Sequence, residues 1–146
     1  MFGTTSWFFW ALLSAAFAAL TAIFAKLGVA AVDADLATLI RTLVIVGLLG
    51  LFVWATGKWS NPLALPGRTL AFLVLSALAA AASWVCYFRA LKLGDVAQVA
   101  PVDKLSLVLV AVFAFIFLGE RPAGREWLGI GLVAAGVVLM ALRRWP

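Results

Sequence analysis

Five long apolar stretches, separated by short polar ones, dominate the chain. They cover residues 7–25, 36–56, 69–91, 96–118 and 127–142. A helix needs roughly 20 mostly apolar residues to cross a hydrocarbon core of ~30 Å. The pattern therefore predicts an all-α integral membrane protein with five transmembrane helices. The last stretch is the shortest, and as a helix it would rise only ~24 Å, less than the thickness of the hydrocarbon core. We expect Arg125, Arg143 and Arg144 to snorkel to the interface and make up for the missing length.

Polar residues mark where the stretches begin and end. Lys26-Leu27-Gly28 and Lys92-Leu93-Gly94 follow the first and third stretches, each with a cation and a glycine that favour the end of a helix. This repetition is compatible with a duplicated helical hairpin, although shared capping chemistry explains it more simply. Asp35 is expected to cap the second helix, and Asp33 is expected to be a solvated loop residue.

Composition narrows the range of functions. Of the 146 residues, 66% are hydrophobic and 12% are charged. The chain has one cysteine, Cys86, and no histidine, which excludes an internal disulfide, Cys/His metal sites and Ser-His or Cys-His catalysis. We therefore predict no enzyme, no catalytic residue, no metal and no cofactor. The net charge of +5 indicates interfacial anchors in a membrane protein, and no nucleic-acid partner is expected.

The distribution of basic residues bears on topology. Five spans place the termini on opposite sides, here called the near side, which holds Met1, and the far side. Four basic residues fall on the near side (Lys58, Arg68, Arg121, Arg125) and five on the far side (Lys26, Arg89, Lys92, Arg143, Arg144). The positive-inside rule then gives only a slight preference for a cytoplasmic C-terminus. A near tie of this kind is expected for dual topology, although many proteins of fixed topology also show one.

An acid and a base lie together inside the fourth stretch. Asp103 and Lys104 follow Pro101, which is expected to kink that helix. Intramembrane charges are costly and mark functional sites. Arg41 in the second stretch lies at a similar depth, ~8–11 Å from the helix start, so an Arg41–Asp103 ion pair is geometrically available.

Lys26 and Tyr87 approach the same layer from the ends of the first and third stretches. Trp84 lies toward the same interface, where it is expected first as a residue of the aromatic belt and second as a residue that stacks on a ligand. Three roles are open for this polar layer: it binds a substrate, it gates a substrate path, or it only holds the helices together. The predicted path or gate residues are Arg41, Asp103, Lys104, Lys26, Tyr87 and Trp84.

The order of these features resembles the EamA-type domain of the drug/metabolite transporter superfamily. The resemblance is carried by Arg41, by Tyr87-Phe88-Arg89-Ala90-Leu91, by Pro101, by Leu118-Gly119-Glu120-Arg121 and by Trp127-Leu128-Gly129. It implies a multi-pass protein of the inner membrane that forms half of a ten-helix carrier. Two halves would combine as a homodimer, expected to be antiparallel, around a central cavity. The implied function is secondary transport of small metabolites or drugs by alternating access.

One feature departs from related four-helix multidrug carriers, which have a glutamate in the first span. No carboxylate occurs in residues 7–25, and Asp103 is the acid expected inside a span. Because basic groups outnumber acids in the polar layer, an anionic or zwitterionic substrate is favoured. The alternative functions are a subunit of a flippase for lipid-linked substrates and an accessory or structural membrane protein.

Overall fold

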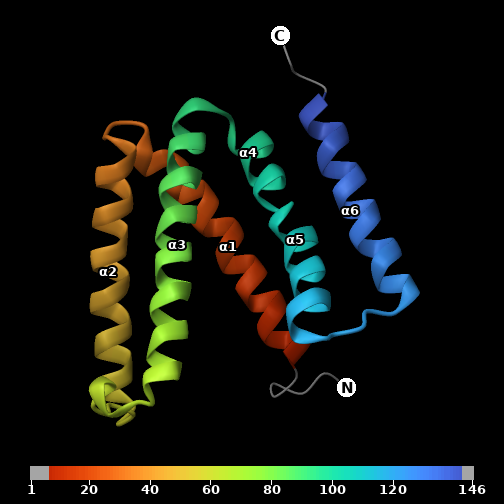
Figure 1. Cartoon of the computed structure of the whole chain (residues 1–146). Helices are drawn as coiled ribbons and strands as arrows, with labels where there is room; N and C mark the ends of the chain where they lie inside the picture. The colour runs from red at the N-terminus through yellow and green to blue at the C-terminus, as the bar shows by residue number, and fades with distance from the viewer. Residues whose placement is uncertain (1–6, 143–146) are drawn as a thin grey trace. The chain divides into compact units, whose positions relative to one another are not determined.

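A computed structural model describes residues 7–142, which form helices and turns with no strand among them. Five segments are long and apolar enough to cross a membrane: α1 (Trp7–Val29), α2 (Ala34–Ala55), α3 (Gly67–Leu93), the segment Val96–Leu118 and α6 (Gly124–Leu142) (Figure 1). A short 3₁₀ turn, η1 (Pro62–Ala64), lies between α2 and α3. The predicted all-α membrane class with five spans is confirmed.

Several helix ends differ from the prediction by one to four residues, and two of these differences change an interpretation. α1 continues through Gly28 to Val29, so this glycine does not stop the helix. α6 begins at Gly124 and has 19 residues, which rise ~28 Å. Its first turn contains Arg125, and snorkelling by this residue stays a prediction. Arg143 and Arg144, which were expected to snorkel, lie outside the described residues.

The fourth span is interrupted where a single helix was expected. It consists of α4 (Val96–Asp103), α5 (Ser106–Phe113) and a π-helical turn, η2 (Ala114–Leu118). Around the interruption, the amides of Lys104 and Leu105 donate to carbonyls three residues earlier, at 3.0 Å each. The irregular turn therefore lies three residues beyond Pro101, at a point where the backbone tightens from α-helical to 3₁₀-type bonding.

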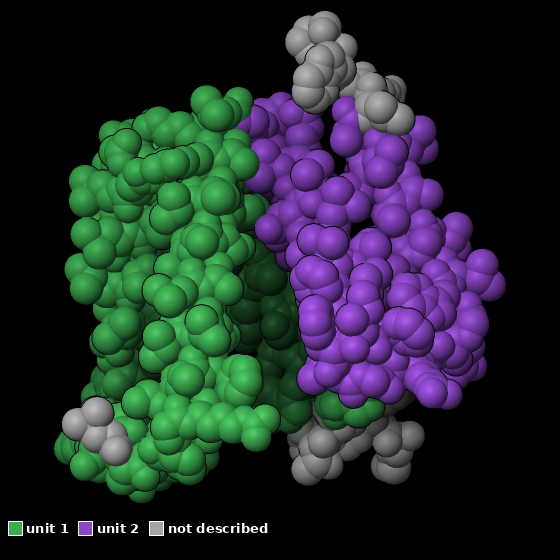
Figure 2. Space-filling view, viewed as in Figure 1, with its two compact units in different colours: residues 1–93 green, residues 94–146 purple. Residues whose placement is uncertain are grey.

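The chain divides into two compact units, Met1–Leu93 and Gly94–Pro146, which Figure 2 colours separately. In unit 1, α2 lies along α3, whereas α1 diverges from both toward its N-terminal end (Figure 1). Four buried residues, Val29, Ala34, Phe88 and Leu91, come from the end of α1, the start of α2 and the end of α3. We call this region the closed end of unit 1.

Unit 2 consists of α4, α5, η2 and α6, with α6 packed on α4 and α5. Gly119 ends η2 with a φ of +68°, a conformation that glycine adopts at little cost. The Glu126 carboxylate accepts a hydrogen bond from the Ala123 amide at 2.6 Å, which is half of a capping box. The Phe115 and Trp127 rings meet edge-on, with centroids 6.3 Å apart, so the turn between η2 and α6 is held from both sides.

Candidate functional site

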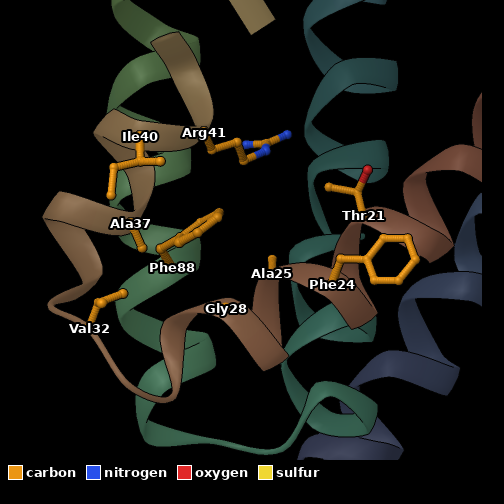
Figure 3. Close-up of a pocket in the computed structure, with 9 residues that line it drawn as sticks. All are labelled: Thr21, Phe24, Ala25, Gly28, Val32, Ala37, Ile40, Arg41 and Phe88. Atoms are coloured by element: carbon orange, nitrogen blue, oxygen red, sulfur yellow. The ribbon is translucent and has the colours of Figure 1, made fainter. Parts of the chain in front are cut away.

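A cavity of about 490 Å³ opens between α1 and α2 in unit 1, next to the closed end (Figure 3). Its walls are mostly apolar, and Phe88 of α3 supplies one of them. Polar groups come from Thr21 of α1 and Arg41 of α2. The lining residues are Thr21, Phe24, Ala25, Gly28, Val32, Ala37, Ile40, Arg41 and Phe88. An apolar pocket with few polar groups is the usual form of a small-molecule site.

Arg41 is positioned by aromatic rings of α3. Its guanidinium carbon lies 4.5 Å from the centroid of the Trp84 ring and 5.6 Å from that of Phe88. These rings share a face of α3 because the two residues are four positions apart. In Figure 3 the arginine side chain extends from α2 toward the side of the pocket that carries Thr21. Within the described part of unit 1, no carboxylate forms an ion pair with Arg41. The pocket therefore contains a cation that is held by rings.

Two lysines bind backbone carbonyls at the closed end. Lys26 of α1 donates from Nζ to the carbonyl of Leu91 at 2.7 Å, and Lys92 of α3 donates to the carbonyl of Val32. The last carbonyls of a helix lack partners within the helix, so a lysine amine from a neighbouring element can satisfy them. Lys26 therefore joins α1 to the end of α3. The sequence predicted that Lys26 lies in the polar layer but did not predict its partner.

The assignment of Asp33 and Asp35 was wrong. Asp33 is the N-cap of α2, and its carboxylate accepts hydrogen bonds from the amides of Asp35 and Leu36 at 2.9 and 3.2 Å. Asp35 instead accepts from Nε and Nη2 of Arg89 at 2.9 and 2.7 Å. Both residues suit an N-cap, and the helix begins one residue earlier than Asp35. Asp103 was expected to be the only acid inside a span, but Asp35 lies in the first turn of α2 and Glu126 in the first turn of α6.

The remaining predicted residues lie as follows. Tyr87 places its ring edge-on to Phe88, with centroids 6.5 Å apart. In unit 2, Lys104 Nζ lies 3.3 Å from Asp103 Oδ2, next to the interruption after α4. An Arg41–Asp103 pair would join the two units and stays a prediction.

Sequence reasoning missed two features of unit 1: the Asp35–Arg89 ion pair and the pocket walls formed by Phe24 and Phe88. The ion pair could have been found with the depth count that was applied to Arg41. Asp35 is near the start of α2 and Arg89 is near the end of α3, so both lie at the same side of the membrane. Nothing in the sequence distinguished Phe24 from the other phenylalanines of α1.

Comparison with known proteins supports a transporter. A transporter in the cobO 3′ region of Sinorhizobium sp. is 61% identical over 137 residues, which cover 94% of this chain and 97% of that protein. A riboflavin transporter of Rhizobium johnstonii is 37% identical over 67 residues, covering 46% of this chain and 22% of that protein.

A more distant relative is a probable 4-amino-4-deoxy-L-arabinose-phosphoundecaprenol flippase subunit, ArnE, of Hamiltonella defensa. It is 29% identical over 73 residues, which cover 50% of this chain and 66% of that protein. No solved structure matches the chain significantly. These names indicate a transporter rather than an enzyme. The family model for EamA-like transporters matches residues 5–142, and the chain belongs to that family.

Proposed function

We propose that the chain is a secondary transporter that moves small metabolites or drugs by alternating access, and that the Arg41 pocket receives the substrate. Membership of the EamA-like transporter family supports the transport function. The observation that carries the site is the Arg41 guanidinium in an otherwise apolar pocket, placed there by Trp84 and Phe88. Intramembrane cations of this kind mark substrate paths.

The chemistry of the pocket favours an anionic or zwitterionic substrate with an apolar body. A guanidinium has five N–H donors in a planar fork that matches a carboxylate or phosphate. Around Arg41, the walls come from Phe24, Ile40 and Phe88, which match an apolar or aromatic group. Thr21 adds one hydroxyl opposite the arginine.

We further propose that two chains combine as an antiparallel homodimer. Transporters of many folds place the substrate between inverted repeats, and this chain supplies five spans. On α6, Gly129 and Gly136 are seven residues apart and share one face of the helix. Beyond the backbone of α6 itself, a Cβ placed on either glycine would meet no atom of the described residues within 4 Å. Close helix contacts in membranes use such residues, so this face suits contact with a second copy.

Transport can be tested with purified protein in proteoliposomes. Suitable probes are radiolabelled benzoate as an aromatic anion, phenylalanine as a zwitterion and tetraethylammonium as a cation. We expect flux of the anion or the zwitterion to be lost in Arg41→Gln and retained in Arg68→Gln. Arg68 is a suitable control because it lies at the start of α3, far along the helix from Trp84 and Phe88. Undiminished flux in Arg41→Gln would refute the proposed site. The Asp103→Asn variant tests the predicted gate in the same assay.

The orientation of the dimer can be tested by cysteine labelling in cells. In a Cys86→Ser background, a single cysteine at Ser60 or at Ala31 lies in the loops on opposite sides of the membrane. Antiparallel assembly predicts that an impermeant maleimide labels about half of each population before permeabilisation, since dual topology places each loop outside in half of the copies. Complete labelling of one position and none of the other would refute antiparallel assembly but not transport.

A second candidate function is a subunit of a flippase for lipid-linked substrates. The similarity to the ArnE flippase subunit supports it. This function predicts that the chain alone moves no soluble probe and co-purifies with a different membrane protein. Flux of a soluble anion by the chain alone would contradict it. Co-purification with no flux of its own would also fit an accessory role, and a lipid-flip assay on the purified complex would separate the two.

A further inference from the structure

A second cavity, of about 630 Å³, runs between α2 and α3 in unit 1. Alanines and larger aliphatic residues form most of its walls. The lining residues are Asp35, Thr38, Leu39, Thr42, Val74, Ala77, Leu78, Ala80, Ala81, Trp84 and Val85. We call this cavity the α2–α3 groove.

The two threonines of the groove do not make it polar. The Thr38 hydroxyl donates to the carbonyl of Ala34, and the Thr42 hydroxyl donates to that of Thr38, both at 2.8 Å. Hydroxyl donors that are satisfied within their own helix leave the methyl groups to form the wall. The groove therefore matches a hydrocarbon chain better than a sugar or a peptide.

One end of the groove carries the Asp35–Arg89 ion pair. The side chains of Arg89 and Asp35 are 61% and 52% exposed. Arg89 uses two of its five N–H donors on Asp35. Three donors remain for an acceptor such as phosphate, and the carboxylate keeps lone pairs for a cation. This end therefore offers a positive and a negative group side by side.

The dimensions of the groove match one leaflet of a bilayer. α3 has 27 residues and rises ~40 Å, so its ends reach beyond a hydrocarbon core of ~30 Å. Arg89 is four residues before the end of α3, ~6 Å along the axis, which places the ion pair at the hydrocarbon boundary. From Val85 to Val74 the groove follows α3 for ~16 Å, about the depth of one leaflet.

We infer that the α2–α3 groove binds a phospholipid with a zwitterionic headgroup of the phosphatidylethanolamine class. An acyl chain lies between α2 and α3, the headgroup phosphate accepts hydrogen bonds from Arg89, and the ammonium group donates to Asp35. Charge complementarity with the exposed ion pair and the leaflet-long apolar groove select this occupant. The site is separate from the Arg41 pocket, which opens between α1 and α2.

Native mass spectrometry of protein extracted in a mild detergent can test the lipid site. The protein is incubated with equal amounts of phosphatidylethanolamine and phosphatidylglycerol, and the bound fractions are compared. We expect wild type to retain phosphatidylethanolamine preferentially, by on the order of fivefold, as for one half-exposed ion pair. Asp35→Asn should reverse the preference toward phosphatidylglycerol, because Arg89 then lacks its carboxylate. A merely structural ion pair would not change which headgroup is bound.

Two further variants separate the headgroup from the groove. Ala81→Trp fills the groove and should reduce retention of both lipids. Arg68→Gln, at the other end of α3, should leave both unchanged. The inference is overturned if Asp35→Asn keeps the wild-type preference or if Ala81→Trp retains lipid normally. It is also overturned if a cysteine at Leu78, in the Cys86→Ser background, forms a disulfide-linked dimer in membranes, because a second copy would then occupy the groove.

Discussion

Arg41 and Trp84 should be energetically coupled, and the structure sets the size of the coupling. The guanidinium carbon lies 4.5 Å from the ring centroid, well within the ~6 Å range of cation–π attraction. Such contacts contribute ~0.5–1 kcal/mol at exposed sites and ~2 kcal/mol when desolvated. Both side chains are half-buried, so we expect a coupling of about 1–2 kcal/mol. Phe88, at 5.6 Å, adds less because it is farther away.

A double-mutant cycle measures this coupling. Free energies of unfolding in mixed micelles are compared for wild type, Arg41→Gln, Trp84→Leu and the double variant. Arg68 and Phe72 provide a matched control, because the guanidinium carbon lies 5.9 Å from an exposed ring of a weaker type. The control cycle should give about 0.5 kcal/mol or less. If the Arg41–Trp84 coupling is no larger than the control, ring stacking does not position Arg41.

Three further predictions concern stability and use the same unfolding measurement. Asp33→Ala should lose about 1 kcal/mol because two amides at the start of α2 lose their cap; an unchanged value would mean that water replaces the cap without cost. Lys26→Met should lose about 1 kcal/mol because the Leu91 carbonyl loses its donor, and Lys58→Met, in the α2–α3 linker, should change little. Gly119→Ala should lower the free energy of unfolding by about 1 kcal/mol because the φ of Gly119 is +68°. Gly47 lies inside α2, where an added Cβ would meet no neighbouring atom within 4 Å, so Gly47→Ala should be neutral or stabilising. Equal effects at the two glycines would contradict the left-handed turn.

The spans could be predicted from the sequence because lipid imposes length and apolarity on every crossing helix. Their ends were less predictable, because several residue types can start or stop a helix. Asp33 and Asp35 are both suitable caps, and the choice between them depends on where the first backbone bond of α2 forms, from Ala37 to the carbonyl of Asp33. Gly28 was expected to end α1, but the helix continues past it to Val29. A glycine near a helix end allows the helix to stop there but does not require it.

The environment of Arg41 could be predicted only in part. A count along the helix gives the depth of a residue, so Arg41 was expected at the level of Asp103, Lys26 and Tyr87. It does not give the direction of the side chain, which depends on how α2 and α3 face each other. Asp35 pairs with Arg89, whereas Arg41 faces two rings. Both results depend on how two consecutive helices, α2 and α3, face each other, and a single sequence does not encode that orientation locally.

The hydrogen bond that joins α1 to α3 at the closed end has a mechanical consequence. Lys26 binds the Leu91 carbonyl close to where α1 ends, whereas the opposite ends of these helices diverge (Figure 1). α1 has 23 residues and is ~34 Å long. From Lys26 back to Trp7 the helix is ~28 Å long, so a tilt of about 10° around the lysine contact would move its N-terminal end by about 5 Å. α1 would therefore pivot at this contact, so that a small change of its angle near the Arg41 pocket produces a large displacement at the opposite membrane surface.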